Sequence, residues 1–263
     1  MSGPTERFSS RADNYARYRP GYPPGAIELL RARCGLAPGA AVADLGSGTG
    51  ILTELLLRTG AEVFAVEPNG PMRAAAEAQL QRYPNFHSVE GCAEATTLAA
   101  RSLDLLVAGQ AFHWFDAPRA RAEALRVLRP DASAALLWNE RPAEPTPFLA
   151  DYEALLLEHA AEYAPISASR ADAAAMRGFL GEAMELATFP NQQVLDYAGL
   201  EGRLMSSSYA PEPGHPQYQP MIAGLREVFA RHQRDGSIVM PYRTLVYFSC
   251  PFYQTRTRSA GAR

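Results

Sequence analysis

The chain has 263 residues, of which 47% are hydrophobic and 20% are charged, and its formal net charge is −3. This length and composition suit one large α/β domain or a domain with a sizeable insertion, and the weak charge argues against nucleic acid as the main partner. The sequence has no apolar signal segment at its N-terminus and no run of about 18 apolar residues, so we expect a cytoplasmic protein that does not bind a membrane.

Strand and helix patterns alternate in the first half of the chain. Helices are predicted at 25–36, 50–59, 70–80 and 118–128, and strands at 40–46, 61–67, 85–91, 103–110 and 132–139. The strands are short and almost continuously apolar. Such strands, each followed by a helix, predict a parallel sheet that is covered on both faces.

The pattern changes after Asn139, where a proline-rich break occupies residues 141–147. Helices are predicted at 148–164, 169–180, 198–208 and 221–233, and two strands at 184–197 and 237–250. We therefore predict a Rossmann-like, seven-stranded, mostly parallel sheet with helices on both faces, an antiparallel terminal strand and a helical insertion after strand five.

The stretch "VADLGSGTG", residues 42–50, ends the first predicted strand. Gly46 and Gly48 leave room for an adenosine against the main chain at the carboxyl end of the sheet. The dinucleotide pattern requires glycine or alanine where this chain has Ile51, and Asp44 would repel a pyrophosphate. The loop therefore favours a ligand with positive charge and no phosphate, such as S-adenosylmethionine (SAM).

Acidic residues follow the next two strands. Glu67 ends the second strand, where a carboxylate can accept hydrogen bonds from both ribose hydroxyls. After the third strand, either the Glu94 side chain or the backbone at Ala93 would bind the adenine amino group.

The segments "VADLGSGTGILT", "VFAVEPNGPM", "GCAEATTL" and "LDLLVAGQAFHWFD" resemble successive motifs of class I SAM-dependent methyltransferases. The sequence is most similar to the small-molecule group of ubiquinone/menaquinone-biosynthesis methyltransferases and trans-aconitate methyltransferase, with a strong resemblance over residues 7–140. One departure is Asp131-Ala132, where such proteins usually have a glycine pair. The resemblance implies SAM as cofactor, S-adenosylhomocysteine as product and a small-molecule acceptor, in secondary metabolism.

The resemblance also implies a role for each matching position. The methionine part of SAM would be surrounded by Asp44, Gly46, Ser47, Gly48 and Thr49. The adenosine would be held by Glu67, Pro68, Met72, Cys92, Ala93 and Glu94. The floor beneath the sulfonium would be formed by Gln110, Ala111, Phe112, His113 and Trp114. Residues 5–22 would order over SAM as a lid that carries Tyr15, Arg19 and Tyr22.

These assignments divide the chain into four regions: 1–35 as N-terminal lid and first helix, 36–141 as SAM-binding core, 142–236 as a mainly helical substrate cap, and 237–263 as terminal strand and basic tail.

Three residues are candidates for catalysis. His113 would act as a general base, or would only hold its loop through a backbone hydrogen bond. Asn139 would orient a substrate or the SAM amino group, or would form an Asx turn before Pro142. Tyr15 would present an aromatic face to the sulfonium.

The acceptor pocket is expected to be aromatic and to have no clear charged clamp. Candidate residues in the insertion are Tyr152, Tyr163, Met176, Phe179, Met205 and Tyr209. Cys34, Cys92 and Cys250 have no paired spacing, so no metal site and no disulfide framework are expected. We expect a monomer or homodimer.

The sequence is also compatible with two alternatives to methyl transfer. A methyltransferase fold can also cyclise SAM itself to azetidine-2-carboxylate with release of methylthioadenosine, or can bind SAM without catalysis.

Overall fold

The computed structural model describes residues 17–163 and 173–252. Its seven strands form one sheet in the order β3-β2-β1-β4-β5-β7-β6. The strands are β1 (Ala41–Leu45), β2 (Glu62–Val66), β3 (Phe86–Val89), β4 (Leu103–Gly109), β5 (Leu128–Glu140), β6 (Glu185–Leu195) and β7 (Ile238–Ser249). Strands β1 to β5 pair in parallel, and β7 runs antiparallel between β5 and β6. The predicted fold class is confirmed.

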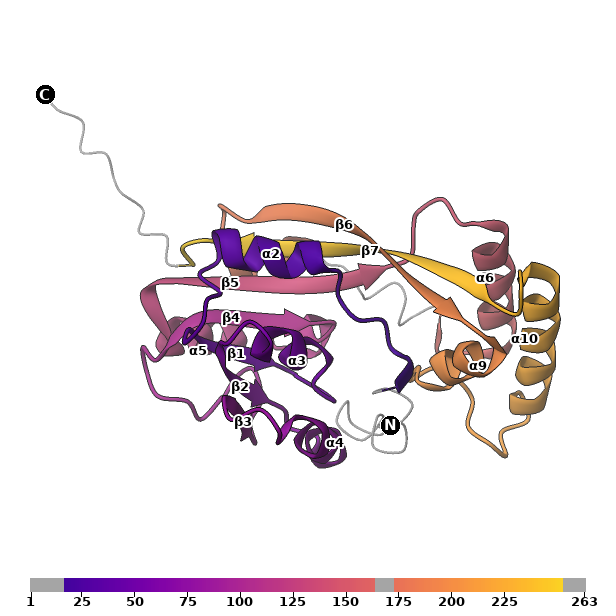
Figure 1. Cartoon of the computed structure of the whole chain (residues 1–263), viewed down its shortest axis with the longest axis horizontal. Coiled ribbons are helices and arrows are strands. Elements are labelled where there is room, and N and C mark those ends of the chain that lie inside the picture. The colour runs from indigo at the N-terminus through magenta and orange to yellow at the C-terminus, as the bar shows by residue number, and fades with distance from the viewer. Residues whose placement is uncertain (1–16, 164–172, 253–263) are drawn as a thin grey trace, which may run out of the picture.

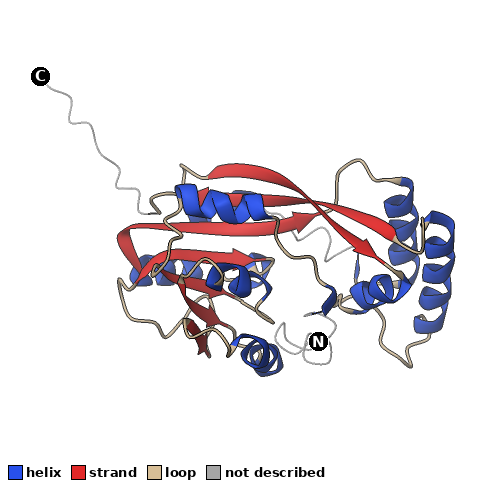
Figure 2. Ribbon diagram, viewed as in Figure 1, coloured by secondary structure: helices blue, strands red, loops and turns tan. Residues whose placement is uncertain are grey.

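Helices cover both faces of this sheet (Figure 2). They are α2 (Pro24–Arg33), α3 (Ile51–Leu57), α4 (Gly70–Leu80), α5 (Ala117–Val127) and α8 (Ala173–Leu180). Side chains of β1 alternate between two cores: Val42 packs with α2, α3 and α4, whereas Ala43 and Leu45 pack with α5 and α8. This two-residue period explains why each strand is apolar along almost its whole length.

The remaining helices form a cap at one end of the sheet, beyond the carboxyl ends of the parallel strands (Figure 1). They are α6 (Pro147–His159), α9 (Tyr197–Met205) and α10 (Tyr218–His232). Their core also includes Leu195 of β6 and Met240 and Tyr242 of β7. The cap is therefore built directly on the paired ends of β6 and β7, and its position relative to the sheet is fixed by strand pairing.

Two expectations about the second half need correction. Met176 and Phe179 do not line a substrate pocket, because α8 packs them into the core under α5. The helix predicted over 148–164 ends at His159, where Ala160 leaves helical geometry.

The fold also brings two free cysteines together. The Sγ atoms of Cys34 and Cys250 lie 3.0 Å apart because β7 returns beside α2, a proximity that sequence spacing does not reveal.

None of the helices in the described ranges is both long and apolar enough to cross a membrane.

Candidate active site

The glycine loop follows β1 at the carboxyl edge of the sheet. The backbone N–H groups of Gly46 and Ser47 donate to the carbonyl of Val66, at 2.9 and 3.2 Å, so the loop is tied to the end of β2. Gly46 has a φ of +65°, and a Cβ at this position would come 2.7 Å from the Cβ of Ala111. Both facts require glycine there, since a side chain would separate the loop from the segment that follows β4.

Asp44 lies beneath this loop and is only 1% exposed. Its Oδ2 accepts a hydrogen bond of 2.7 Å from the Thr53 hydroxyl, and its Oδ1 has no partner among the described residues. The pKa of Asp44 is raised to about 7, mainly because the carboxyl group is buried. The hydrogen bond from Thr53 lowers this pKa, and the negative charge of Glu67 raises it further. A buried carboxylate oxygen without a donor is unusual and indicates a missing cationic or hydrogen-bonding ligand.

Glu67 follows β2 and is also buried. Its Oε2 accepts from the backbone N–H of Gly48 and its Oε1 from that of Asn69, both at 2.8 Å. Burial raises the pKa of Glu67, against the effect of these two hydrogen bonds. Each carboxylate oxygen can accept a second hydrogen bond, so Glu67 is oriented by the protein and still able to bind ligand hydroxyls.

The residues around the loop fit SAM better than a dinucleotide. Two buried carboxylates face the same region, and the hydroxyls of Ser47 and Thr49 have no partner in the described part of the chain. A pyrophosphate would be repelled by both carboxylates, whereas an ammonium and ribose hydroxyls would satisfy them.

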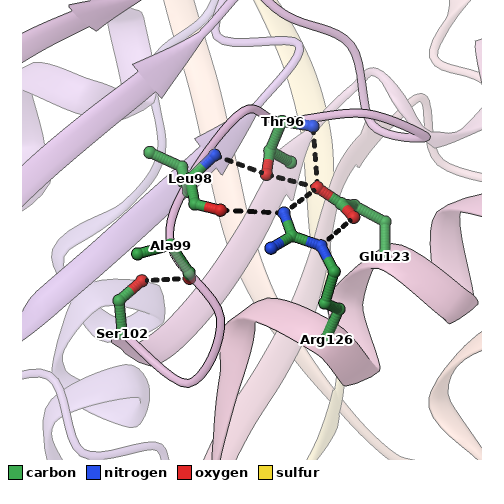
Figure 3. Close-up of polar contacts among 6 residues, drawn as sticks. All are labelled: Thr96, Leu98, Ala99, Ser102, Glu123 and Arg126. Carbon is green, nitrogen blue, oxygen red and sulfur yellow. Dashed lines mark hydrogen bonds and ion pairs between the residues drawn. The ribbon is translucent and has the colours of Figure 1, made fainter.

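The loop after β3 carries Cys92, Ala93 and Glu94 and is anchored to α5 by the network in Figure 3. The Thr96 backbone N–H and hydroxyl donate to Glu123 Oε1 at 2.8 and 2.6 Å, and Arg126 donates to both carboxylate oxygens at 2.7 Å. The guanidinium holds the pKa of Glu123 near 2. Glu94 accepts from the backbone N–H of Asp116 at 2.7 Å, so its carboxylate also stabilises the start of α5.

The floor of the site lies between β4 and β5. Gln110 has a φ of +58°, and its side-chain amide exchanges two 3.2 Å hydrogen bonds with the backbone of Asn139. The His113 ring, in the short 3₁₀ helix η2 (Phe112–Trp114), has its centroid 4.5 Å from that of Trp114 and 5.6 Å from that of Trp138. His113 therefore stands in an aromatic wall, and its role as a base stays a prediction.

Asn139 has protein partners at both side-chain polar atoms. Its Nδ2 donates to the carbonyl of Gly21 at 3.1 Å, and its Oδ1 accepts from Thr244 Oγ1 at 2.6 Å and from Asn191 Nδ2 at 3.2 Å. These contacts join the N-terminal segment to β5, β6 and β7. They favour a positioning role for Asn139 over the substrate or SAM contact predicted from the sequence.

Residues 17–22 of the predicted lid pack against the sheet edge and the cap. Arg19 Nη2 donates to the carbonyl of Ser206 at 2.8 Å, and the carbonyl of Tyr18 accepts from Gln193 Nε2 at 3.0 Å. A Cβ at Gly109 would lie 2.4 Å from the Tyr22 hydroxyl, so Tyr22 closes over the end of β4. Tyr15 and the rest of the lid, before residue 17, lie outside the described residues.

Most predicted site residues line one cavity of about 960 Å³ between the sheet edge and the cap. They are Arg19, Gly46, Gly48, Glu67, Pro68, Met72, Cys92, Ala93, Glu94, Gln110, Ala111, His113, Trp114 and Asn139. A small adjoining cavity is lined by Tyr22, Asp44 and Ser47 and shares Arg19 and Gly48 with the large one. Thr49 and Phe112 are buried outside both linings.

The cavity also contains residues that the sequence did not indicate. They are Asn69, Trp138, Glu140, Arg141, Glu153, Arg203 and Tyr242. No clear charged clamp was expected in the insertion, yet Arg203 of α9 lines the cavity. Of the predicted aromatics from the insertion, Tyr163 lines the cavity. Arg203 lies in an ordinary helical pattern, so only the fold shows that it faces a cavity.

Residues 43–136 match the sequence pattern of the methyltransferase domain family. This stretch therefore forms a methyltransferase domain, and the chain is similar to class I SAM-dependent methyltransferases. An uncharacterized methyltransferase of Mycobacterium tuberculosis is 42% identical over 136 residues, which are 51% of this chain and 52% of that protein. A methyltransferase-like protein of Schizosaccharomyces pombe is 25% identical over 246 residues, covering 92% and 94% of the two chains. The chain spans about half the length of the mycobacterial relatives that it matches.

Solved structures share the methyltransferase fold. A candidate type II methyltransferase from Anaeromyxobacter dehalogenans has a TM-score of 0.59 at 23% identity and covers 88% of this chain and 96% of its own. A phosphoethanolamine N-methyltransferase of Haemonchus contortus, in complex with S-adenosylhomocysteine, has a TM-score of 0.51 at 11% identity. The match covers 92% of this chain and 57% of that one. SAM is the cofactor that membership of the methyltransferase family implies.

Proposed function

We propose that this chain transfers a methyl group from SAM to a small molecule bound beneath the cap. The observation that carries the proposal is the unpartnered Oδ1 of Asp44, buried beside the glycine loop and Glu67 next to a cavity of about 960 Å³. Cavities of this size and enclosure take small ligands. The reaction's place in secondary metabolism is part of the same proposal.

The residues present divide the binding of SAM between them. Asp44 would hold the ammonium, Glu67 the ribose hydroxyls, and the loop of Cys92–Glu94 the adenine edge, while Arg19 is suited to the carboxylate by its planar guanidinium. When bound, SAM supplies an electrophilic methyl group on a sulfonium. The aromatic wall of His113, Trp114 and Trp138 would exclude water from it. Positioning of this kind can contribute about 7–11 kcal/mol to methyl transfer.

The cavity weighs against the alternative in which SAM is cyclised. Cyclisation needs only one bound molecule, whereas this cavity extends past the glycine loop to Tyr163, Arg203 and Tyr242 of the cap. That additional space supports an intermolecular reaction with a second substrate.

Product analysis tests the proposal. The pure protein is incubated with methyl-labelled SAM, alone and with a protein-free small-molecule extract, and the products are identified by mass spectrometry. We expect S-adenosylhomocysteine and a labelled small molecule only when the extract is present. Methylthioadenosine from SAM alone would identify the cyclase, and binding of SAM without turnover would identify a non-catalytic binding protein.

Matched variants show whether the product depends on the proposed site. Glu67→Gln should reduce product formation at limiting SAM. Arg73 donates to the backbone carbonyl of Glu67 at 2.9 Å and to the carboxylate of Glu90 at 3.0 Å. Glu90→Gln should leave product formation unchanged, because Glu90 is exposed and does not line the cavity.

A further inference from the structure

Arg203 of α9 is a buried cation without a counter-ion among the described residues. It is 6% exposed and lines the cavity beside Tyr242 and Ser208. Its Nε donates to the Tyr242 hydroxyl and its Nη1 to the Ser207 hydroxyl, both at 3.2 Å. Both partners are neutral. Within the described ranges, Nη2 has no acceptor and no carboxylate lies within ion-pair distance of the guanidinium.

The acidic residues of this part of the cavity already have cationic partners. Glu153 accepts from Arg141 Nη1 at 2.6 Å and also from the Tyr163 hydroxyl. Glu140 lies 4.0 Å from Arg243. With these two carboxylates paired, Arg203 is left as a buried cation of the cap end without a carboxylate partner in the described part of the chain.

The guanidinium is held in one orientation by its neighbours. The Tyr242 hydroxyl that accepts from Nε itself donates to Gln193 Oε1 at 3.0 Å and lies 2.7 Å from the sulfur of Met240. A buried charge without a partner is costly, and a fixed guanidinium recognises carboxylates through its planar set of donors. The Arg203 guanidinium therefore forms a preorganised binding site for an anion.

The cavity that Arg203 lines also has a largely apolar wall. It is formed by Trp138, Pro142, Leu149, Ala150, Ala154 and Leu157. One unpaired charge and an apolar wall together select a monoanion with an apolar body.

We propose that the acceptor is an apolar or aromatic monocarboxylate whose carboxylate is anchored by Arg203. That the bound acid is the methyl acceptor rests on the proposed function. The anion site itself is tested by binding.

Calorimetry on the protein saturated with S-adenosylhomocysteine tests the anion site. The probes are benzoate, 3-phenylpropionate and octanoate, their primary amides, and phenyl phosphate. We expect at least one acid to bind ten or more times tighter than its amide and tighter than phenyl phosphate. Arg203→Met should abolish this preference and leave the affinity for S-adenosylhomocysteine within about twofold of wild type. Arg203→Lys should retain part of the preference.

Equal binding of acids and amides, binding of no acid, or tighter binding of the phosphate ester would overturn the inference. If S-adenosylhomocysteine itself fails to bind, the proposed function fails, and the acids are then titrated into the free protein to decide on the anion site alone.

Unfolding in denaturant provides a second readout that does not need a ligand. Arg203→Met removes a buried unpaired charge, so it should raise the unfolding midpoint, whereas an arginine with only a structural role would lower it. Arg226→Met is the matched control. Arg226 also donates from its Nε to a tyrosine hydroxyl, that of Tyr197, at 3.3 Å, but it lies on the exposed side of α10. A lowered midpoint for Arg203→Met together with unchanged acid binding would contradict the inference.

Discussion

Among the described residues, the glycine-loop end of the cavity has two buried carboxylates, Asp44 and Glu67, which accept hydrogen bonds from neutral groups, whereas the cap end has a buried guanidinium, Arg203, without a carboxylate partner. The first end lies in the part of the chain that matches the methyltransferase domain family, and the second lies beyond it. The difference suggests that the site is divided into an end for the cationic donor and an end for an anionic acceptor. A substitution at one end should therefore leave binding at the other end largely unchanged.

The largest effect is expected from Asp44→Asn. Without the carboxylate, the affinity for S-adenosylhomocysteine should fall by at least about 100-fold, since loss of one partner of a buried charge pair costs roughly 3–5 kcal/mol. Acid binding at Arg203 should change little. Calorimetry measures both affinities, and a loss of acid binding equal to that of S-adenosylhomocysteine would show that the two ends are not separate.

The same variant should be more stable than wild type above pH 7. The pKa of Asp44 is raised from 3.8 to about 7, so the folded state binds more protons than the unfolded state between these values, and stability falls as pH rises through this range. Asp44→Asn should remove that fall and gain up to about 4 kcal/mol at pH 8. Denaturant unfolding at pH 5 and pH 8 checks this. Asp131→Asn, at an exposed carboxylate, serves as control.

Affinity for S-adenosylhomocysteine should depend on pH in the wild type. The ammonium requires ionised Asp44, so the affinity should decrease by roughly tenfold for each pH unit below about 7 and be constant at higher pH. Calorimetry at constant ionic strength measures the profile. A flat profile between pH 5 and pH 8 would remove Asp44 from the binding of the ammonium.

Glu67→Gln should cause a smaller loss of affinity for S-adenosylhomocysteine than Asp44→Asn. The hydrogen bonds that a charged carboxylate makes to ribose hydroxyls are worth about 1.5–3 kcal/mol, which corresponds to roughly a 10–100-fold loss of affinity. Glu90→Gln should have no measurable effect, because Glu90 is exposed and faces away from the cavity lining. If the two variants bind S-adenosylhomocysteine equally well, Glu67 has no ribose role.

The smallest effect on binding is expected for Glu123→Gln, which weakens the anchor of the Cys92–Glu94 loop. The free energy of unfolding should fall by about 1.5–3 kcal/mol, the range for hydrogen bonds to a charged group, and the affinity for S-adenosylhomocysteine by only a few fold. In the wild type, the stabilisation from this carboxylate should be present above about pH 4.5 and be lost as pH falls toward 2. Glu227→Gln, an exposed substitution on α10, is the control in the same unfolding assay.

The sheet type and the residues that gather around the glycine loop could be predicted because both depend on short-range patterns. Asp44 and Glu67 follow apolar strands whose carboxyl ends meet in any parallel sheet. The acceptor end could not be predicted in this way. Arg203, Tyr242 and Arg141 come from a helix, the last strand and a loop, and only the pairing of β6 with β7 places them around one cavity.

Some residues have contacts that the sequence does not reveal. Asn139 and Gln110 line the cavity as predicted ligand contacts, and their side chains also connect the N-terminal segment, β4 and β5. A polar residue at a strand end has the same signature whether it binds a ligand or a neighbouring backbone. The distinction needs the partners, which the sequence alone does not give.

A crystal structure with S-adenosylhomocysteine bound would show whether the two ends of the cavity bind separate ligands. We expect the amino nitrogen of the ligand within about 3 Å of Asp44 Oδ1, its ribose hydroxyls donating to Glu67, and the space from Trp138 to Arg203 open for a second molecule. A ligand that leaves Asp44 Oδ1 without a contact, or that fills the cavity as far as Arg203, would contradict this division of the cavity.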